Sequence, residues 1–314
     1  MNTTWLGHWH ALVCAALVLG PSMGRAASSA PPPAVADLAT ALSLAGDRVE
    51  GFIARAQSLI CTEVVSMTPL NSGLTSDGFA RTVESELRLS WDPDNGGPAT
   101  ETQTRRQVLK VNGRPPRKDD RNNCTTPEQQ ETEEQPLAML LPQQRHEYAF
   151  TLAGLGNVDG HAAVMIDFRE LAQARVDIQA VDGKEDCVRY DVDGGLRGRL
   201  WIDRQTSDVL RLEQRLTGMV DMRLPQSLIR RPGVSPVWTL ERADTSIRFG
   251  RVAFADPEET LVLPLTSSSM RITRGSGTPR LRTVTKYSSY KRFLTGGRLV
   301  GDEADTASPS TKLQ

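Results

Sequence analysis

The residue types that most often carry out chemistry are scarce in this sequence. The 314 residues include four histidines, and only His146 and His161 lie beyond the apolar N-terminal segment. His146 begins an expected strand and His161 follows the turn Asp159-Gly160, positions at which a histidine is usually solvated. The sequence contains no Gly-x-Ser-x-Gly, His-Glu-x-x-His or phosphate-binding glycine motif. We therefore expect a protein that is not an enzyme and needs no cofactor, with a hydrolase of unidentified site as the third choice of function.

Metal-binding patterns are equally weak. No Cys-x-x-Cys pair or Cys/His spacing typical of zinc is present. The carboxylates of Asp256, Glu258 and Glu259 are close in sequence, but a solvated turn explains them better than a calcium site does. We predict no metal site.

The cysteines suggest one disulfide bond. Cys61, Cys124 and Cys187 remain if the N-terminal segment is removed. An odd number in an exported protein suggests one bridge and one free thiol. Which cysteines pair is left open by the sequence. The candidate is Cys61 with Cys124, because Cys124 lies in an otherwise untethered loop and Cys187 lies in an expected strand, where a lone thiol packs well.

The N-terminus has the features of an export signal. Residues 11–20 form an apolar run that is too short to span a bilayer as a helix. Pro21 and Gly24 interrupt the run, and Gly24-Arg25-Ala26 offers the small residues at which a signal peptidase cleaves. Lipidation at Cys14 is disfavoured because Val13 precedes it. Residues 1–26 are thus predicted to be a signal peptide cleaved near Ala26, which implies a periplasmic protein, or alternatively a secreted one.

Composition divides the rest of the chain. Residues 27–34 are a small-residue and proline leader and residues 301–314 a polar tail, both expected to be disordered. Residues 35–300 are predicted to form one domain without a transmembrane segment. The formal net charge of −1 is not that of a nucleic-acid-binding protein, which needs a basic face.

An amphipathic helix is expected at the start of the domain. Its apolar residues recur at steps of three and four, which is typical of a helix with one buried stripe. These residues are Val35, Leu38, Leu42, Ala45, Val49, Phe52, Ala56 and Leu59.

Two expected hairpins carry the candidate ligand-contacting residues. In 83–91 and 199–216, apolar side chains alternate with polar ones, which is typical of strands buried on one face. Residues 101–111 are the return strand of the first hairpin. The inward-facing residues, which we propose as the walls of an apolar cavity, are Leu87, Leu89, Trp91, Leu200, Ile202, Leu210, Leu212 and Leu216. Ordinary core packing is the alternative role for the same residues.

The remaining pattern predicts a mainly β (α+β) fold. Further strands are expected at 146–152, 163–169, 186–191, 237–254, 259–274 and 280–293, and 209–220 is expected to be one strand. Residues 113–136 are polar and proline-rich and are expected to be a loop, whereas 137–141 is a short apolar helix. The spacing of these elements predicts a meander of about ten antiparallel strands.

This order of elements resembles the LolA/LolB-like lipoprotein-carrier superfamily, and in particular a branch related to outer-membrane lipoprotein-sorting proteins. The resembling segments are ICTE at 60–63, HEYAFTLAG at 146–154, the hairpin at 199–216, TSIRFGRVAFADPEETLVLP at 245–264 and YSSYKRFLTGGRLV at 287–300. The resemblance implies a strongly curved, half-open antiparallel β-barrel of about ten strands, with the N-terminal helix and the short central helix covering its concave face. It also implies a cavity between them that holds acyl chains. The expected function is therefore a periplasmic carrier of lipid or of an acylated protein, with envelope membrane proteins as further partners. The alternative is a non-catalytic structural or interaction module of the cell envelope.

Overall fold

The described part of the chain forms a continuous body of strands and short helices. The computed structural model describes residues 37–55, 58–90, 101–117, 120, 130–181, 184–224, 229, 235–255, 258–276 and 280–292. The chain divides into the units Met1–Ala34 and Val35–Gln314, and all described residues belong to the second. The predicted signal peptide, leader and tail lie outside the described residues.

One antiparallel sheet dominates this unit. Its order is β4-β3-β2-β1-β14-β13-β12-β10-β9-β6-β5, and β11 pairs with β12 as a twelfth strand. The strands are β1 (Ser58–Leu70), β2 (Arg81–Ser90), β3 (Glu101–Val111), β4 (Gln130–Glu134), β5 (Tyr148–Val158), β6 (His161–Glu170), β9 (Leu196–Asp203), β10 (Val209–Leu216), β11 (Val220–Arg223), β12 (Val237–Ala255), β13 (Glu258–Arg274) and β14 (Arg280–Arg292). A separate hairpin consists of β7 (Arg175–Val181) and β8 (Lys184–Asp193).

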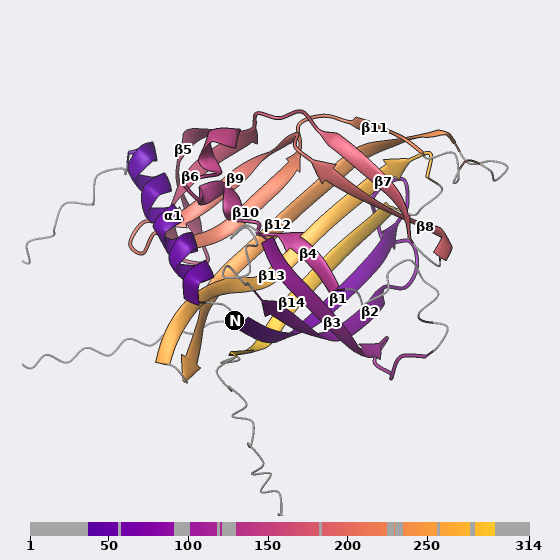
Figure 1. The fold of residues 1–314 in the computed structure, drawn as a ribbon, viewed down its shortest axis with the longest axis horizontal. Helices are drawn as coiled ribbons and strands as arrows, with labels where there is room; N and C mark the ends of the chain where they lie inside the picture. Colours follow the sequence, from indigo (N-terminus) through magenta and orange to yellow (C-terminus); the bar gives the residue numbers. More distant parts are fainter. Residues whose placement is uncertain are drawn as a thin grey trace, which may run out of the picture. The chain divides into compact units, whose positions relative to one another are not determined.

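The sheet is curved and open. Its end strands, β4 and β5, do not pair with each other, so the sheet does not close into a barrel. Figure 1 shows the long strands β12, β13 and β14 running diagonally through the middle of the sheet. The first strand, β1, pairs with the last, β14, from Leu59–Arg292 to Leu70–Arg280. The predicted half-open, mainly antiparallel β fold is confirmed.

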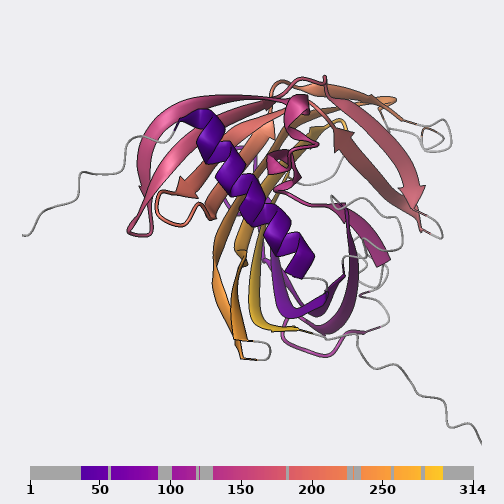
Figure 2. The ribbon, with the colours of Figure 1, turned by 60° about the vertical axis from the view of Figure 1, so that its left-hand side comes forward.

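Helix α1 (Leu38–Arg55) crosses the concave side of the sheet (Figure 2). Its buried apolar side chains are Ala41, Leu42, Ala45, Val49 and Ile53. Leu42, Ala45 and Val49 belong to the predicted stripe, whereas the predicted Leu38 and Phe52 are half-buried and Ala41 and Ile53 were not predicted. The helix ends earlier than expected. Leu59 is fully buried but belongs to β1, because an apolar residue at the right spacing fits a strand as well as a helix.

Two 3₁₀ turns hold α1 in place: η3 (Ala138–Leu140) and η4 (Arg145–Glu147). The guanidinium of Arg145 donates from Nε to the carbonyl of Leu140 and from Nη2 to the carbonyl of Leu42, both at 2.8 Å. Gly46 lets the two backbones approach closely, since a Cβ atom there would lie 2.5 Å from the Leu140 carbonyl oxygen. The predicted short central helix is thus present, as a 3₁₀ turn.

Two apolar clusters form the core. The larger one lies between α1, η3 and the middle strands, and includes Ala45, Leu140, Ile166, Leu200, Leu212 and Leu263. The smaller one consists of Leu216, Met222, Leu224, Trp238 and Leu240, with Val176 and Ile178 of β7 packed against it.

Several boundaries differ from expectation. Residues 130–134 of the expected loop form β4, which pairs with Glu101–Arg105 through its backbone although every one of its residues is polar. The expected strand at 209–220 is split into β10 and β11 by a bend at 217–218. The strand β7 was not anticipated, although Val176 and Ile178 alternate with polar residues in it. His146 lies in η4 and is exposed, instead of beginning a strand.

A candidate binding cavity on the concave face of the sheet

A cavity of about 300 Å³ opens between the second half of α1 and the concave face of the sheet. Val49 and Phe52 of α1 form one side of it. Strands β2, β3, β12, β13 and β14 form the other. Most of the lining side chains are apolar: Val49, Phe52, Leu87, Leu89, Leu137, Val209, Ile247, Phe249, Leu261, Val262 and Leu263. The site is therefore an apolar pocket with polar groups at particular points of its wall.

The predicted wall residues lie in different surroundings. Leu87 and Leu89 line the cavity. Leu200, Ile202 and Leu212 are at most 2% exposed and lie in the larger core cluster, where protein atoms cover them. Leu216 belongs to the smaller cluster, and Trp91 lies outside the described residues.

A β-bulge removes Leu210 from the inward face. Val209 lies opposite Ile202, but Arg211, two residues later, lies opposite Trp201, one position away, so Leu210 is the additional residue. Val209 is consequently buried and lines the cavity, whereas Leu210 is only half-buried. The sequence prediction assumed strict alternation along the strand, which puts Leu210 on the same face as Leu212. The bulge breaks this alternation, so the prediction for Leu210 was wrong.

Arg106, in what we call the inner wall of the cavity, forms an ion pair with Glu63, which does not itself line the cavity. Arg106 of β3 donates from Nε to Glu63 Oε2 at 2.9 Å and from Nη2 to Oε1 at 3.3 Å, across the intervening strand β2. The Glu63 side chain is 3% exposed and that of Arg106 is 21% exposed. The pair is locally neutral, so it makes this end of the cavity polar without giving it a net charge.

Cys61 lies beside this pair and is a free thiol in the structure, not part of a disulfide. It is 1% exposed, and burial together with the charge of Glu63 raises its pKa to about 12. Tyr290 is close by; its hydroxyl donates to the Pro264 carbonyl at 2.5 Å, and burial raises its pKa. Cys124, the predicted partner of Cys61, lies outside the described residues, as does the side chain of Cys187.

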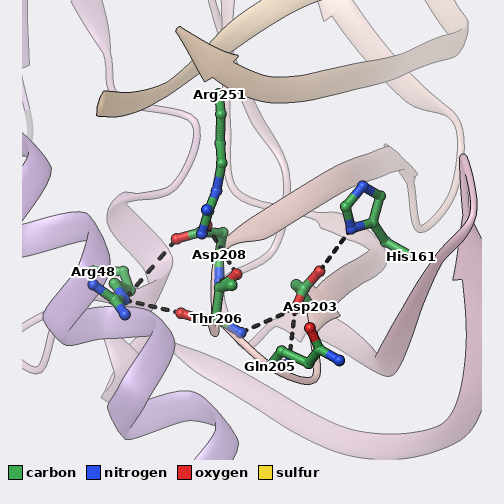
Figure 3. Close-up of polar contacts among 7 residues, drawn as sticks. All are labelled: Arg48, His161, Asp203, Gln205, Thr206, Asp208 and Arg251. Atoms are coloured by element: carbon green, nitrogen blue, oxygen red, sulfur yellow. Dashed lines mark hydrogen bonds and ion pairs between the residues drawn. The ribbon is translucent and has the colours of Figure 1, made fainter. Parts of the chain in front are cut away.

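Two arginines that line the cavity, Arg48 and Arg251, meet at Asp208 (Figure 3). Because both side chains are more than half exposed, we call this part of the cavity its mouth. Arg251 of β12 donates to Asp208 Oδ2 from Nη2 at 2.7 Å and from Nε at 3.0 Å. Arg48 of α1 donates to the Thr206 carbonyl at 2.9 Å and lies 4.0 Å from Asp208 Oδ1. Asp208 is 9% exposed, whereas the side chains of Arg48 and Arg251 are 58% and 59% exposed. The arginines therefore face both the cavity and the solvent.

The turn between β9 and β10 positions this mouth. The Asp203 carboxylate accepts the backbone N–H groups of Gln205 at 2.7 Å and Thr206 at 2.9 Å, and contacts His161 Nδ1 at 3.2 Å. Burial opposes the charged form of Asp203. The hydrogen bonds from Thr206 and Gln205 and the nearby His161 outweigh it, so the Asp203 pKa is lowered. The contact between His161 and Asp203 is thus part of a turn. Neither residue lines the cavity.

Within the described ranges, no group of three or more His, Cys, Asp or Glu side chains is placed to hold a metal ion. No helix in the described part of the chain is long and apolar enough to cross a bilayer. The chemistry that the cavity supports is the burial of an apolar group, with charged groups at its mouth and its inner wall.

A second, polar groove of about 670 Å³ lies on the outward-facing residues of β6, β9, β10, β12 and β13. Trp201 lies between two arginines, with the guanidinium carbons of Arg211 and Arg199 at 4.9 and 5.9 Å from its ring centroid. Arg199 also donates to Asp167, from Nε at 2.5 Å and from Nη2 at 3.0 Å. This groove is lined mostly by charged and polar side chains and is not suited to an apolar ligand.

Comparisons with known proteins return only likenesses of structure. No family model and no curated protein matches the chain. A structure described as an outer membrane lipoprotein-sorting protein domain from Vibrio parahaemolyticus is 10% identical, with a TM-score of 0.37 over 80% of this chain and 94% of that one. A DUF1329 family protein from Desulfovibrio piger is 14% identical, with a TM-score of 0.35 over 82% and 92% of the two chains. A LolA superfamily protein from Nitrosomonas europaea is 9% identical, with a TM-score of 0.29 over 80% and 93%. The superfamily that the sequence resembles is among these structures, and the likeness is one of fold alone.

Proposed function

We propose that the protein binds the acyl chain of a lipid, or of an acylated protein, in the cavity beneath α1 and carries it. The observation that supports this function is the apolar lining of a cavity that remains unfilled by side chains. Protein interiors are close-packed, so an apolar space of this size in an otherwise packed core suggests a ligand site.

The size of the cavity favours a single chain. Small-molecule sites usually measure roughly 300–1,000 Å³, and this cavity of about 300 Å³ is at the lower end. Burial of a chain gains about 0.8 kcal/mol per methylene. An aliphatic wall therefore provides affinity without specific polar contacts.

The place of action follows from the N-terminal segment. We propose that residues 1–26 direct export and are removed near Ala26, so that the carrier acts in the periplasm between envelope membranes. The intact mass of the exported protein tests this, since it should correspond to a chain that begins near Ala27 and carries no acyl group. An acyl group on Cys14 would mean a membrane-anchored protein instead.

The binding function is tested by calorimetric titration with octanol, decanol and dodecanol, after co-purified lipid has been removed. Because each methylene contributes to burial, affinity should rise about fourfold for each added carbon until the cavity is full. Leu89→Trp, which places an indole in the cavity, should weaken the binding of decanol. Leu109→Trp is the matched control, because Leu109 lies on the neighbouring strand β3, is 42% exposed and does not line the cavity. No binding by the parent protein would refute the function.

The second candidate is the non-catalytic interaction module. It is supported by the filled core behind the hairpin, where Leu200 and Leu212 are fully buried by protein, and by the polar groove around Trp201. Trp201→Ala tests this candidate. If the protein is an interaction module, the variant should lose a protein partner, and neither parent nor variant should bind alcohols. If it is a carrier, the variant should bind alcohols as the parent does.

A further inference from the structure

We propose that the mouth of the cavity binds the anionic head group, a phosphate or a carboxylate, of a single-chain amphiphile through Arg48 and Arg251. This inference rests on the proposed function, because the chain must occupy the cavity for the head group to reach the mouth. It adds the charge class of the ligand and its orientation.

The geometry brings two cations to one side of the opening. Arg48 comes from α1 and Arg251 from β12, and both line the cavity. They converge on Asp208, Arg251 from the strand and Arg48 from the helix, as Figure 3 shows. A head group between the helix and the sheet would therefore meet a guanidinium on each side.

The charges at the mouth do not cancel. Arg48 and Arg251 share the single carboxylate of Asp208, which leaves these three groups with one net positive charge. That carboxylate also accepts the Thr206 hydroxyl at 2.9 Å. The inner wall differs, because Arg106 and Glu63 form a neutral pair there. An anionic amphiphile therefore gains by placing its chain inward and its charge at the mouth.

The arginines retain hydrogen-bonding capacity toward solvent. A guanidinium has five N–H donors in a planar fork that matches phosphate and carboxylate oxygens. Arg251 directs Nε and Nη2 at Asp208, and Arg48 directs Nε at the Thr206 carbonyl. More than half of each side chain is exposed, so the remaining donors can reach a ligand. Asp208 and Thr206 hold both forks in place before the ligand arrives.

The test compares ligands that share a twelve-carbon chain and differ in the head group. Dodecyl phosphate, laurate, dodecanol and dodecyltrimethylammonium are titrated calorimetrically into the lipid-free protein, below their micelle concentrations. Dodecyl phosphate and laurate should bind about tenfold more tightly than dodecanol, since charge-assisted hydrogen bonds are about twice as strong as neutral ones. The cation should bind most weakly. The preference for the anions should fall as salt is raised, because the site is partly exposed. Inorganic phosphate alone should not bind measurably, which separates a lipid head group from free phosphate as the ligand.

Variants assign the effect to the mouth. Arg251→Gln and Arg48→Gln should each remove most of the preference for dodecyl phosphate over dodecanol, with both affinities measured on the same variant. Arg251→Lys should keep a part of the preference, because the charge remains and the fork is lost. Arg274→Gln is the matched control: Arg274 is 66% exposed, pairs with one acid, Glu241, and does not line the cavity. Thermal unfolding confirms that each variant is folded.

The outcomes separate this inference from the function on which it rests. Equal affinities for dodecyl phosphate and dodecanol would overturn the head-group site and leave the carrier function standing. Absence of binding by all four amphiphiles would overturn both. Tight binding of inorganic phosphate alone would point to a free anion as the ligand and would also overturn the inference.

Discussion

Glu63 and Arg106 form a two-pronged ion pair across strand β2, with the closest contact 2.9 Å between Arg106 Nε and Glu63 Oε2. Glu63 lies opposite Ser85 and Arg106 opposite Leu87, two residues further along β2, so the pair crosses β2 diagonally. Glu63 is 3% exposed, and Arg106 is the cation that pairs with its carboxylate among the residues that the structure describes. Of the two side chains, Arg106 lines the cavity.

Removal of one partner should therefore cost much more stability than removal of both. Arg106→Met leaves a buried, uncompensated carboxylate, which should lower the free energy of unfolding by about 3 kcal/mol. Glu63→Met together with Arg106→Met should lower it by much less, since apolar side chains of similar volume pack in the same place. Urea denaturation of the parent, both single variants and the double variant gives a double-mutant cycle, which measures the coupling between the two side chains. Additive losses would show that the two side chains do not compensate each other.

The buried thiol of Cys61 should make stability depend on pH in the alkaline range. Its pKa is raised from 9.0 in the unfolded chain to about 12 in the folded protein, chiefly by burial. The unfolded state therefore loses its proton first, and the contribution of the thiol to stability is complete below pH 9 and declines between pH 9 and 12. The decline should approach about 1.4 kcal/mol per pH unit for this one proton.

The measurement is the difference between the parent and Cys61→Ala, because other groups that titrate are common to both. Urea denaturation at pH values of about 8 and 10 should show a larger loss for the parent. Iodoacetamide should label Cys61 slowly in the native protein and rapidly in urea, since the thiol is protonated and covered. Rapid native labelling would contradict this placement of Cys61, and so would a bond between Cys61 and Cys124 found by non-reducing peptide mapping.

Gly46→Ala should destabilise the protein although alanine favours helices. In an exposed helix the change would stabilise by about 1 kcal/mol. Here the added Cβ would lie 2.5 Å from the Leu140 carbonyl oxygen and 2.0 Å from Arg145 Nη2, so α1 must move away from η3. Ser43→Ala, at an exposed position of the same helix, is the control and should be neutral or slightly stabilising. Thermal unfolding of both variants shows whether the helix propensity of alanine or the close contact between α1 and η3 has the larger effect. A more stable Gly46→Ala protein would show that the contact is not tight.

Leu212 tests whether the hairpin is core or cavity wall. It is fully buried in the larger core cluster and does not line the cavity. Leu212→Ala should lower the free energy of unfolding by about 2–5 kcal/mol, while decanol affinity of the folded protein stays within twofold of the parent. Chemical denaturation and calorimetry below the unfolding temperature measure the two effects separately. A large loss of affinity at unchanged stability would place Leu212 in the binding surface after all.

The sequence predicted the architecture better than the site. The periodicity of apolar residues indicates that a side chain is buried, but it does not indicate whether protein or a ligand covers that side chain. Leu200, Ile202 and Leu212 are buried as their alternation required, but α1 and η3 cover them. Leu87 and Leu89 follow the same kind of pattern and line the cavity. The difference depends on where the helix crosses the sheet, which the local pattern does not contain.

The charged residues of the site left fainter signals. Glu63 lies two positions after Cys61 in an apolar strand, so an acid on a buried face was visible in ICTEVV, although its partner in β3 was not. Arg48 does not break the apolar stripe of α1, so the sequence pattern gives no reason to single it out. Arg251 and Asp208 are 43 residues apart in the sequence, so their contact leaves no local pattern. The mouth is made by long-range pairing of β10 with β12 and by the crossing of α1.

The most direct measurement of acyl-chain binding is the lipid occupancy of the protein as it is purified from the periplasm. Native mass spectrometry, followed by solvent extraction, is applied to the parent, Leu89→Trp and Leu109→Trp. The proposed carrier should retain about one single-chain equivalent of lipid in the parent and in Leu109→Trp, and several-fold less in Leu89→Trp at equal thermal stability. A parent protein free of lipid, or a Leu89→Trp protein that retains as much as the parent, would contradict the binding of acyl chains in this cavity.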